Sequence, residues 1–114
     1  MSDIKTITCE TLKEKIQNKE DLILVDVRSP EERAQGSIGG ESLPLPELAE
    51  RFQELDPEKP IALYCAAGRR SAMAAAFLAE KGYKHLLSLQ GGVTAWEQTF
   101  GEVREMVKPT LVEE

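Results

Sequence analysis

The sequence predicts an α/β fold with a mainly parallel sheet of about five strands and helices on both of its faces. Two short apolar runs, residues 22–27 and 61–64, are typical of strands buried on both faces of a parallel sheet. Helical segments follow both runs, and such alternation along a chain favours parallel pairing. We therefore expect one three-layer domain, a sheet between two layers of helices.

The first elements are a strand, a helix and a strand. Residues 5–8 suggest a short strand, and Thr8 can cap a helix over residues 9–18 through its hydroxyl group. Residues 22–27 are continuously apolar apart from Asp26, and the charge marks the end of the strand. Strand-end loops of parallel sheets carry functional sites, so the residues after this strand are candidates.

The next segment predicts two helices. Ser29 is followed by a proline and, three residues later, by Glu32, which is the pattern of a capping box, and this helix ends at Gly36. Residues 46–55 place apolar side chains on a single stripe, as expected of an amphipathic helix that packs on the sheet.

The second half of the chain predicts two more strands and two more helices. Residues 61–64 form the central strand, and residues 72–79 are apolar all round, which indicates a buried helix that stops at Gly82. Residues 85–89 are a short strand, and residues 93–96 begin a last helix in which Trp96 packs in the core.

Composition limits the class of protein. A chain of 114 residues is one domain, with a core over about residues 5–100 and a C-terminal tail over residues 101–114. The net charge of −6 argues against nucleic acid or membrane lipid as a partner, so an anionic substrate needs a local basic pocket. We find no membrane span and no secretory signal, and we expect a cytoplasmic protein. Two cysteines, Cys9 and Cys65, are too few for a disulfide framework or a zinc site.

The segment after the central strand is the strongest candidate site. Cys65 precedes a helix whose unpaired N–H groups and dipole favour negative charge, and Arg69 and Arg70 are close in sequence. These features lower the pKa of a thiol, so we expect Cys65 to be a nucleophilic thiolate. The small side chains of Ala66 and Ala67, together with Gly68, let the backbone amides turn towards the sulfur.

This segment resembles the six-residue active loop of rhodanese sulfurtransferases, which has cysteine first, glycine fourth and arginine sixth, followed by serine. Three further motifs fall where that family has them, and the resemblance covers about residues 7–96. The matching segments are Cys65-Ala66-Ala67-Gly68-Arg69-Arg70-Ser71, Asp26-Val27-Arg28, Gly36-Ser37-Ile38 and Leu89-Gln90-Gly91-Gly92-Val93-Thr94-Ala95-Trp96.

The resemblance implies a rhodanese-like three-layer sandwich and a sulfur transfer in two steps. Cys65 would take a sulfur atom from thiosulfate or a similar small anionic donor and pass it to cyanide or to a thiol of the glutathione, thioredoxin or dithiol type. Arg70 would orient the loop or the donor, Arg69 would add attraction at the rim, and backbone amides of residues 66–70 would stabilise the persulfide. No metal or organic cofactor is implied. Ser71 is expected to act as a helix cap.

Asp26 and Arg28 are expected to support the active loop, either by pairing with each other or by bracing it, as their position does in the resembled family. Two residues depart from the family pattern: Ser37 stands where histidine is common, and Arg33 stands where an aromatic residue is common. The segment over residues 39–44 also looks shorter than usual by about one residue. These departures affect one wall of the pocket and leave the nucleophile unchanged.

Three other hypotheses remain open. A persulfide carrier would accept sulfur and hand it to one specific partner, and a non-catalytic binding module would use the fold alone. A cysteine phosphatase or arsenate reductase also surrounds a thiolate with amides, but such loops place arginine six residues after the cysteine. Here that position is Ser71, and Arg70 comes one residue early.

Overall fold

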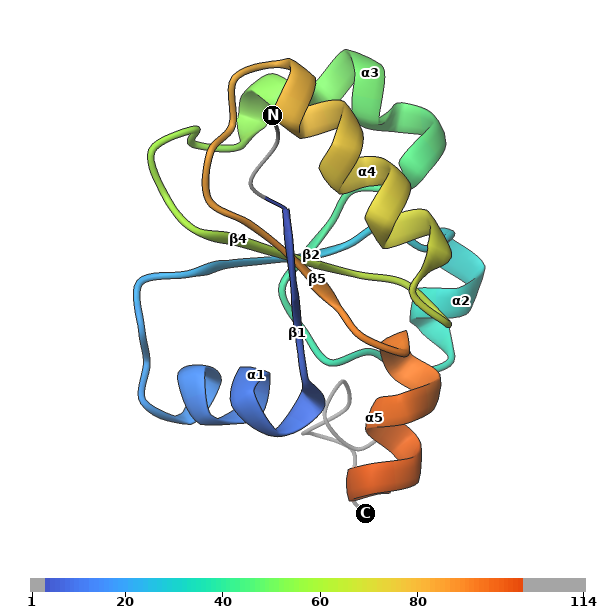
Figure 1. The fold of residues 1–114 in the computed structure, drawn as a ribbon. Coiled ribbons are helices and arrows are strands. Elements are labelled where there is room, and N and C mark those ends of the chain that lie inside the picture. The colour runs from blue at the N-terminus through green and yellow to red at the C-terminus, as the bar shows by residue number, and fades with distance from the viewer. Residues whose placement is uncertain (1–3, 102–114) are drawn as a thin grey trace.

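The computed structural model describes residues 4–101 and places a five-stranded sheet between two layers of helices (Figure 1). Every neighbouring pair of strands is parallel, in the order β1-β5-β4-β2-β3. The α/β prediction is confirmed, and the sheet is parallel throughout. The strands are β1 (Lys5–Ile7), β2 (Ile23–Asp26), β3 (Glu41–Ser42), β4 (Ile61–Tyr64) and β5 (Leu86–Leu89).

Four of the five helices within residues 4–101 cover the sheet, with α3 and α4 over one face and α1 and α5 over the other (Figure 1), whereas α2 has no buried residue. Thr8 caps the first helix and Ser29 forms a complete capping box with Glu32, both as predicted. The predicted tail over residues 101–114 lies outside the described residues, apart from Gly101. The helices are α1 (Cys9–Gln17), α2 (Pro30–Ala34), α3 (Leu48–Arg51), α4 (Arg69–Glu80) and α5 (Gly92–Phe100).

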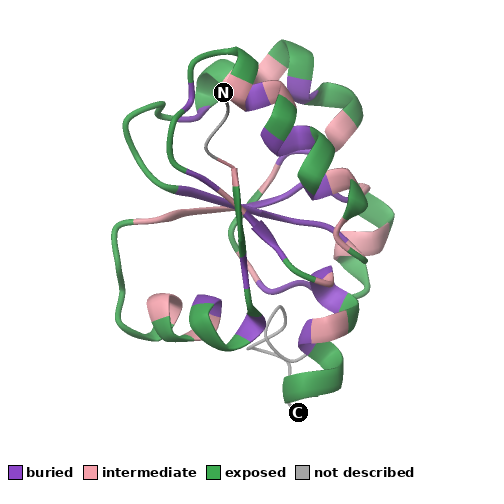
Figure 2. Cartoon of the chain, in the orientation of Figure 1, coloured by how far each residue is buried: buried purple, intermediate pink, exposed green. Residues whose placement is uncertain are grey.

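The central strand β4 contributes side chains to both hydrophobic cores. Leu63 packs in the core beneath α3 and α4, whereas Ala62 and Tyr64 pack in the core beneath α1 and α5. This alternation follows from the period of two of a strand, and it buries all four residues of β4 (Figure 2). The loop that follows β4 therefore starts from the most completely buried strand of the sheet.

Two predicted helices differ from expectation. The amphipathic helix over residues 46–55 is divided into a 3-10 turn (Leu45–Glu47), α3 and a second 3-10 turn (Phe52–Glu54). The Tyr83 hydroxyl lies 2.8 Å from the carbonyl oxygens of both Phe52 and Leu55 and shares its one hydrogen between them. At the end of the segment, Tyr83 is thus the partner of carbonyl groups that a continuous helix would bond to its own N–H groups.

The second difference concerns α4, which was expected to be buried all round. Only the side facing the sheet is buried, and Met73 on the other side is 57 % exposed. The reason is that α4 lies in an outer layer of the sandwich (Figure 2). No helix within residues 4–101 is both long enough and apolar enough to cross a lipid bilayer.

Candidate active site

The candidate site lies where β4 ends and α4 begins. Cys65 directly follows the strand, and Gly68 caps the helix with a left-handed φ of 108°. The carbonyl oxygens of Cys65 and Ala66 accept hydrogen bonds of 2.9 Å from the N–H groups of Val93 and Thr94 in the first turn of α5. The start of the loop is thus bonded to α5 through two backbone carbonyl groups.

Close packing of α5 against the loop requires glycine at position 92. A Cβ atom on Gly92 would overlap the carbonyl oxygen of Cys65, and the residue has a φ of 59°. Any other side chain would push the helix away from the loop. The second glycine of the predicted Gly91-Gly92 turn therefore lets α5 approach the backbone of Cys65.

The sulfur of Cys65 is surrounded by hydrogen-bond donors. The N–H groups of Gly68 and Ser71 lie 3.1 Å and 3.3 Å from Sγ, and the Ser71 Oγ atom lies 3.7 Å from it. Burial raises the pKa of the thiol, but hydrogen bonds from Ser71, Gly68 and Ala67 outweigh burial, so the pKa is lowered overall. The predicted shift is therefore supported, although the donors include the amide of Ser71, outside residues 66–70.

Ser71 does not cap α4 as expected. The cap position belongs to Gly68, and Ser71 is the third residue of the helix, where its hydroxyl donates to the Gly68 carbonyl oxygen at 3.1 Å. The reason is that α4 begins at Arg69, three residues earlier than the apolar run from residue 72 suggested. This places both the amide and the hydroxyl group of Ser71 beside the Cys65 sulfur.

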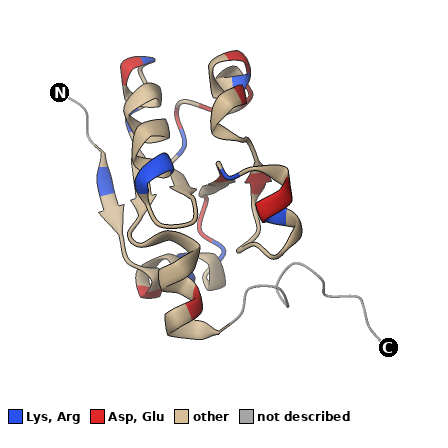
Figure 3. Cartoon of the chain, turned by 90° about the vertical axis from the view of Figure 1, so that its right-hand side faces the viewer, with Lys and Arg blue, Asp and Glu red and all other residues tan. Residues whose placement is uncertain are grey.

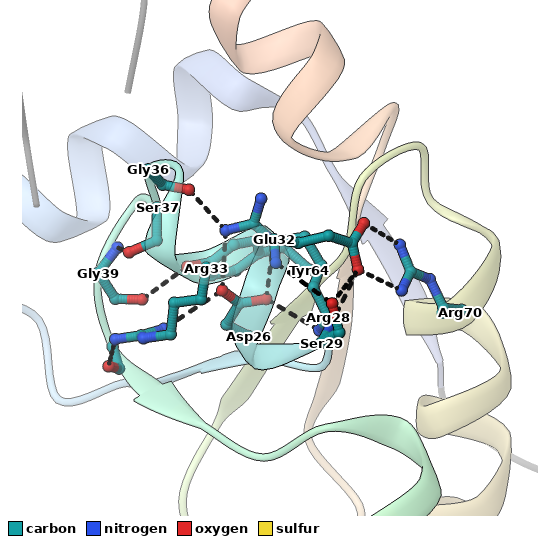
Figure 4. Close-up of polar contacts among 11 residues, drawn as sticks. Asp26, Arg28, Ser29, Glu32, Arg33, Gly36, Ser37, Gly39, Tyr64 and Arg70 are labelled. Atoms are coloured by element: carbon teal, nitrogen blue, oxygen red, sulfur yellow. Dashed lines mark hydrogen bonds and ion pairs between the residues drawn. The ribbon is translucent and has the colours of Figure 1, made fainter. Parts of the chain in front are cut away.

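Arg70 forms a bidentate ion pair with Glu32, which sequence reasoning identified only as part of a helix cap. Its Nη1 and Nη2 atoms lie 2.7 Å and 2.8 Å from the two carboxylate oxygens of Glu32 on α2 (Figure 4). The hydrogen bonds from Arg70 lower the pKa of Glu32 to about 2. Figure 3 shows the basic first turn of α4 near the acidic first turn of α2. Arg69 is exposed and makes no ion pair within residues 4–101.

Asp26 and Arg28 form a buried pair at the end of β2. Asp26 accepts hydrogen bonds from the backbone N–H and side chain of Arg28 at 2.9–3.0 Å, and from Arg33 Nη1 at 3.2 Å. Arg28 also donates to the Gly36 carbonyl oxygen at 2.8 Å, and Arg33 donates to that of Gly40 at 2.6 Å (Figure 4). Arg33, one of the two departures, thus joins Asp26 to the loop before β3.

This network reaches the active loop through Tyr64, the residue before Cys65. The Tyr64 hydroxyl donates to the Gly39 carbonyl oxygen at 2.8 Å, and the Arg28 guanidinium lies 5.7 Å from the centre of the Tyr64 ring. Ser37, the other departure, is buried, and its Oγ atom accepts from the Gly39 N–H at 3.1 Å (Figure 4). Asp26 and Arg28 therefore pair with each other, and Arg28 contacts Tyr64, the residue that precedes the loop.

A small polar cavity of about 210 Å³ lies beside the Arg70–Glu32 ion pair. Its walls come from the end of β2, from α2 and from the start of α5, and it is lined by Arg28, Glu32, Gln35, Gly36, Val93 and Glu97. Within residues 4–101, no three His, Cys, Asp or Glu side chains gather so as to hold a metal ion.

Cys9, the second cysteine, lies at the start of α1 and is buried as a free thiol. Burial and the neighbouring charge of Glu10 raise its pKa, so it is poorly suited to act as a nucleophile.

Comparison with known proteins gives a consistent family. Residues 8–99 match the model of the rhodanese-like domain. A sulfurtransferase of Allochromatium vinosum is 37 % identical over 94 residues, which cover 82 % of this chain and 88 % of the relative. The thiosulfate sulfurtransferase GlpE of Pseudoalteromonas translucida is 36 % identical over 86 residues, 75 % of this chain and 82 % of the relative.

Solved structures include a similar fold. The crystal structure of a rhodanese-related protein from Thermoplasma volcanium superposes with a TM-score of 0.76 at 33 % identity. The match covers 84 % of this chain and 93 % of that one, so almost the whole described fold is shared.

Proposed function

The chain belongs to the rhodanese-like domain family, and from this we propose that it is a sulfurtransferase that moves a sulfane sulfur through a persulfide on Cys65. The observation that carries the proposal is the sulfur environment: Cys65 has a lowered pKa because the amides of Gly68 and Ser71 point at Sγ. Such a thiolate is nucleophilic near neutral pH. Thiosulfate, or a similar small anion, is the proposed donor.

In the first step, the Cys65 thiolate attacks the outer sulfur of thiosulfate. A new sulfur–sulfur bond forms, the bond within thiosulfate breaks, and its electron pair leaves with sulfite. The product is an anionic persulfide on Cys65. In the free protein, the N–H groups of Gly68 and Ser71 donate hydrogen bonds to Cys65 Sγ. These donors would stabilise the negative charge of the thiolate and the adjacent charge of the persulfide.

In the second step, a nucleophilic acceptor attacks the terminal sulfur of the persulfide and releases the Cys65 thiolate. The acceptor is cyanide or a thiol of the glutathione, thioredoxin or dithiol type. Because the thiolate is the leaving group, the same hydrogen bonds that lower the pKa of Cys65 also assist this step. Neither step needs a proton on the sulfur of Cys65.

Two basic residues and the buried pair complete the proposed site. Arg70, held by Glu32, would present its guanidinium to the donor anion at the edge of the loop, and the exposed Arg69 would add attraction. Asp26 and Arg28 would support the loop indirectly, because they fix the backbone around Tyr64 and not the sulfur itself.

Intact-mass measurement after incubation with thiosulfate tests this function. The wild-type protein should gain the mass of one sulfur atom, Cys65→Ala should gain none, and Cys9→Ala, which removes the other thiol, should behave as wild type. A mass gain in Cys65→Ala would contradict the proposal. Failure of the wild-type protein to gain sulfur would favour a non-catalytic binding module.

Steady-state turnover separates an enzyme from a carrier. A sulfurtransferase should form thiocyanate from thiosulfate and cyanide with repeated turnover, whereas a carrier should load one sulfur atom and then stop. Hydrolysis of an aryl phosphate without turnover of thiosulfate would instead support the phosphatase hypothesis.

A further inference from the structure

Ser88 is a buried polar residue in an otherwise apolar strand. It lies in β5, where only 5 % of its surface is exposed, and its register partners are Leu63 of β4 and Thr6 of β1. Its Oγ atom is 2.8 Å from the Oγ atom of Ser71, which is itself fully buried. A hydroxyl at this position is costly unless it is hydrogen-bonded, so its partner explains its place.

The Ser71 hydroxyl has one hydrogen and three acceptors around it. These are the Gly68 carbonyl oxygen at 3.1 Å, which accepts the hydrogen in this structure, Ser88 Oγ at 2.8 Å and Cys65 Sγ at 3.7 Å. The sulfur donates to Ser71 Oγ as a thiol and becomes an acceptor once Cys65 is a thiolate. If the hydrogen is given to Ser88, none remains for the sulfur. If Ser88 donates instead, the Ser71 oxygen accepts and its own hydrogen stays available.

The direction of this hydrogen bond follows from the partners of Ser88. Within residues 4–101, Ser71 is the only hydrogen-bond partner of the Ser88 hydroxyl group. Donation to Ser71 therefore uses the only hydrogen of the Ser88 side chain, and Ser71 keeps its hydrogen for the loop.

We propose that Ser88 is a positioning residue for Cys65: its hydroxyl donates to Ser71 Oγ, so that the Ser71 hydrogen, which the Gly68 carbonyl oxygen accepts while Cys65 is a thiol, is free to turn to the sulfur of the Cys65 thiolate. Hydrogen bonds in such a chain polarise one another, so the Ser71 hydroxyl becomes a better donor to a thiolate. The inference rests on the proposed function, in which Cys65 reacts as the thiolate. The charged groups beside the loop, Arg70 on α4 and Glu32 from α2, pair with each other, and within residues 4–101 neither forms a hydrogen bond with the Ser88 hydroxyl group, so we expect their ion pair to persist in Ser88 variants.

The test is the pH dependence of Cys65 alkylation by iodoacetamide. The mass of the peptide that carries Cys65 reports the reaction, so Cys9 does not interfere. Ser88→Ala should react about threefold more slowly than wild type near pH 6, because one modest hydrogen-bond contribution is lost. Above pH 10, where the thiol of either protein is ionised, the two rates should agree. Thr99→Ala, which removes an exposed hydroxyl group from α5, should follow the wild-type profile.

A double-mutant cycle identifies the route. In a Ser71→Ala background, adding Ser88→Ala should change nothing, because the hydroxyl that it orients is absent. Equal slowing in both backgrounds, a wild-type profile for Ser88→Ala, or slowing at every pH would each overturn the inference. Thermal unfolding confirms that each variant is folded.

Alkylation involves no sulfur donor, so the two proposals fail separately. Persulfide formation together with an unchanged Ser88→Ala profile would overturn only the role of Ser88. A shifted profile in a protein that takes no sulfur from thiosulfate would overturn only the proposed function.

Discussion

Glu32 holds Arg70 through both nitrogen atoms of its guanidinium fork, although the two residues are 38 positions apart. Glu32 also accepts hydrogen bonds from the N–H and hydroxyl groups of Ser29, so one carboxylate both caps α2 and fixes the arginine of the active loop. Since α2 follows β2 and the active loop follows β4, parallel pairing of these strands brings the two groups together.

We predict that Arg70→Lys lowers kcat/KM for thiosulfate about tenfold, although the charge is kept. A lysine cannot bridge both oxygens of Glu32, so the cation loses its fixed position at the loop. Steady-state kinetics with cyanide as acceptor measure the effect. Arg51→Lys is the matched control, because Arg51 also pairs with carboxylates but lies outside the site. A wild-type kcat/KM for Arg70→Lys would show that the fork geometry is not needed.

The same ion pair predicts a specific acid sensitivity. Glu32 has a pKa of about 2 in the folded protein, below its ordinary value of 4.5. Its ionised form therefore adds to the free energy of unfolding above about pH 4.5, and this stabilisation is lost as the pH falls towards 2. The urea midpoint of wild type should therefore approach that of Glu32→Gln over this range. Because the pair is about one-third exposed, the effect is modest and falls with added salt. In an Arg70→Gln background the pH dependence should shrink to the smaller part that comes from the hydrogen bonds of Ser29, and a dependence as large as in wild type would exclude Arg70 as its main cause.

The sequence predicts the strands β2 and β4 well because each is a short apolar run: β4 is buried throughout, and β2 is apolar up to the buried Asp26 at its end. It does not predict β3, whose two residues, Glu41 and Ser42, are polar and unlike a buried strand. Pairing with β2 alone makes this segment a strand. Such an element depends on tertiary register, which no local pattern contains.

The residues of the candidate site likewise divide into those that the sequence predicts and those that it does not. Cys65 and its loop are recognisable because the chemistry lies in consecutive residues. Glu32 and Ser88 were missed as site residues because their partners are 38 and 17 positions away. For Ser88 a signal existed, a single polar residue among the leucines of β5, but its meaning requires knowledge that β5 lies beside β4.

Removing the charge of Asp26 should cost much of the stability of the fold. Asp26 is fully buried and accepts from both Arg28 and Arg33, so Asp26→Asn leaves a buried guanidinium without its counterion. We expect a loss of about 3 kcal/mol in the free energy of unfolding. Arg33→Gln should cost less, because the Arg33 side chain is 26 % exposed and Arg28 still pairs with Asp26. Urea titrations of the two variants check the order, and equal losses would contradict it.

The contact between α5 and the active loop predicts a large effect of Gly92→Ala. The added methyl group would overlap the Cys65 carbonyl oxygen, which already accepts from Val93, so either the helix or the loop must move. We expect a destabilisation of about 3 kcal/mol together with loss of sulfur transfer, because movement of the loop displaces the amides from the sulfur.

Gly82→Ala is the matched control: its φ of 96° is also left-handed, but a Cβ atom there meets nothing within 4 Å. Its cost should be only the backbone strain of about 1 kcal/mol, with full activity. Urea titration and thiocyanate formation measure both variants. Equal destabilisation of the two would mean that strain, and not the contact with Cys65, requires glycine at position 92.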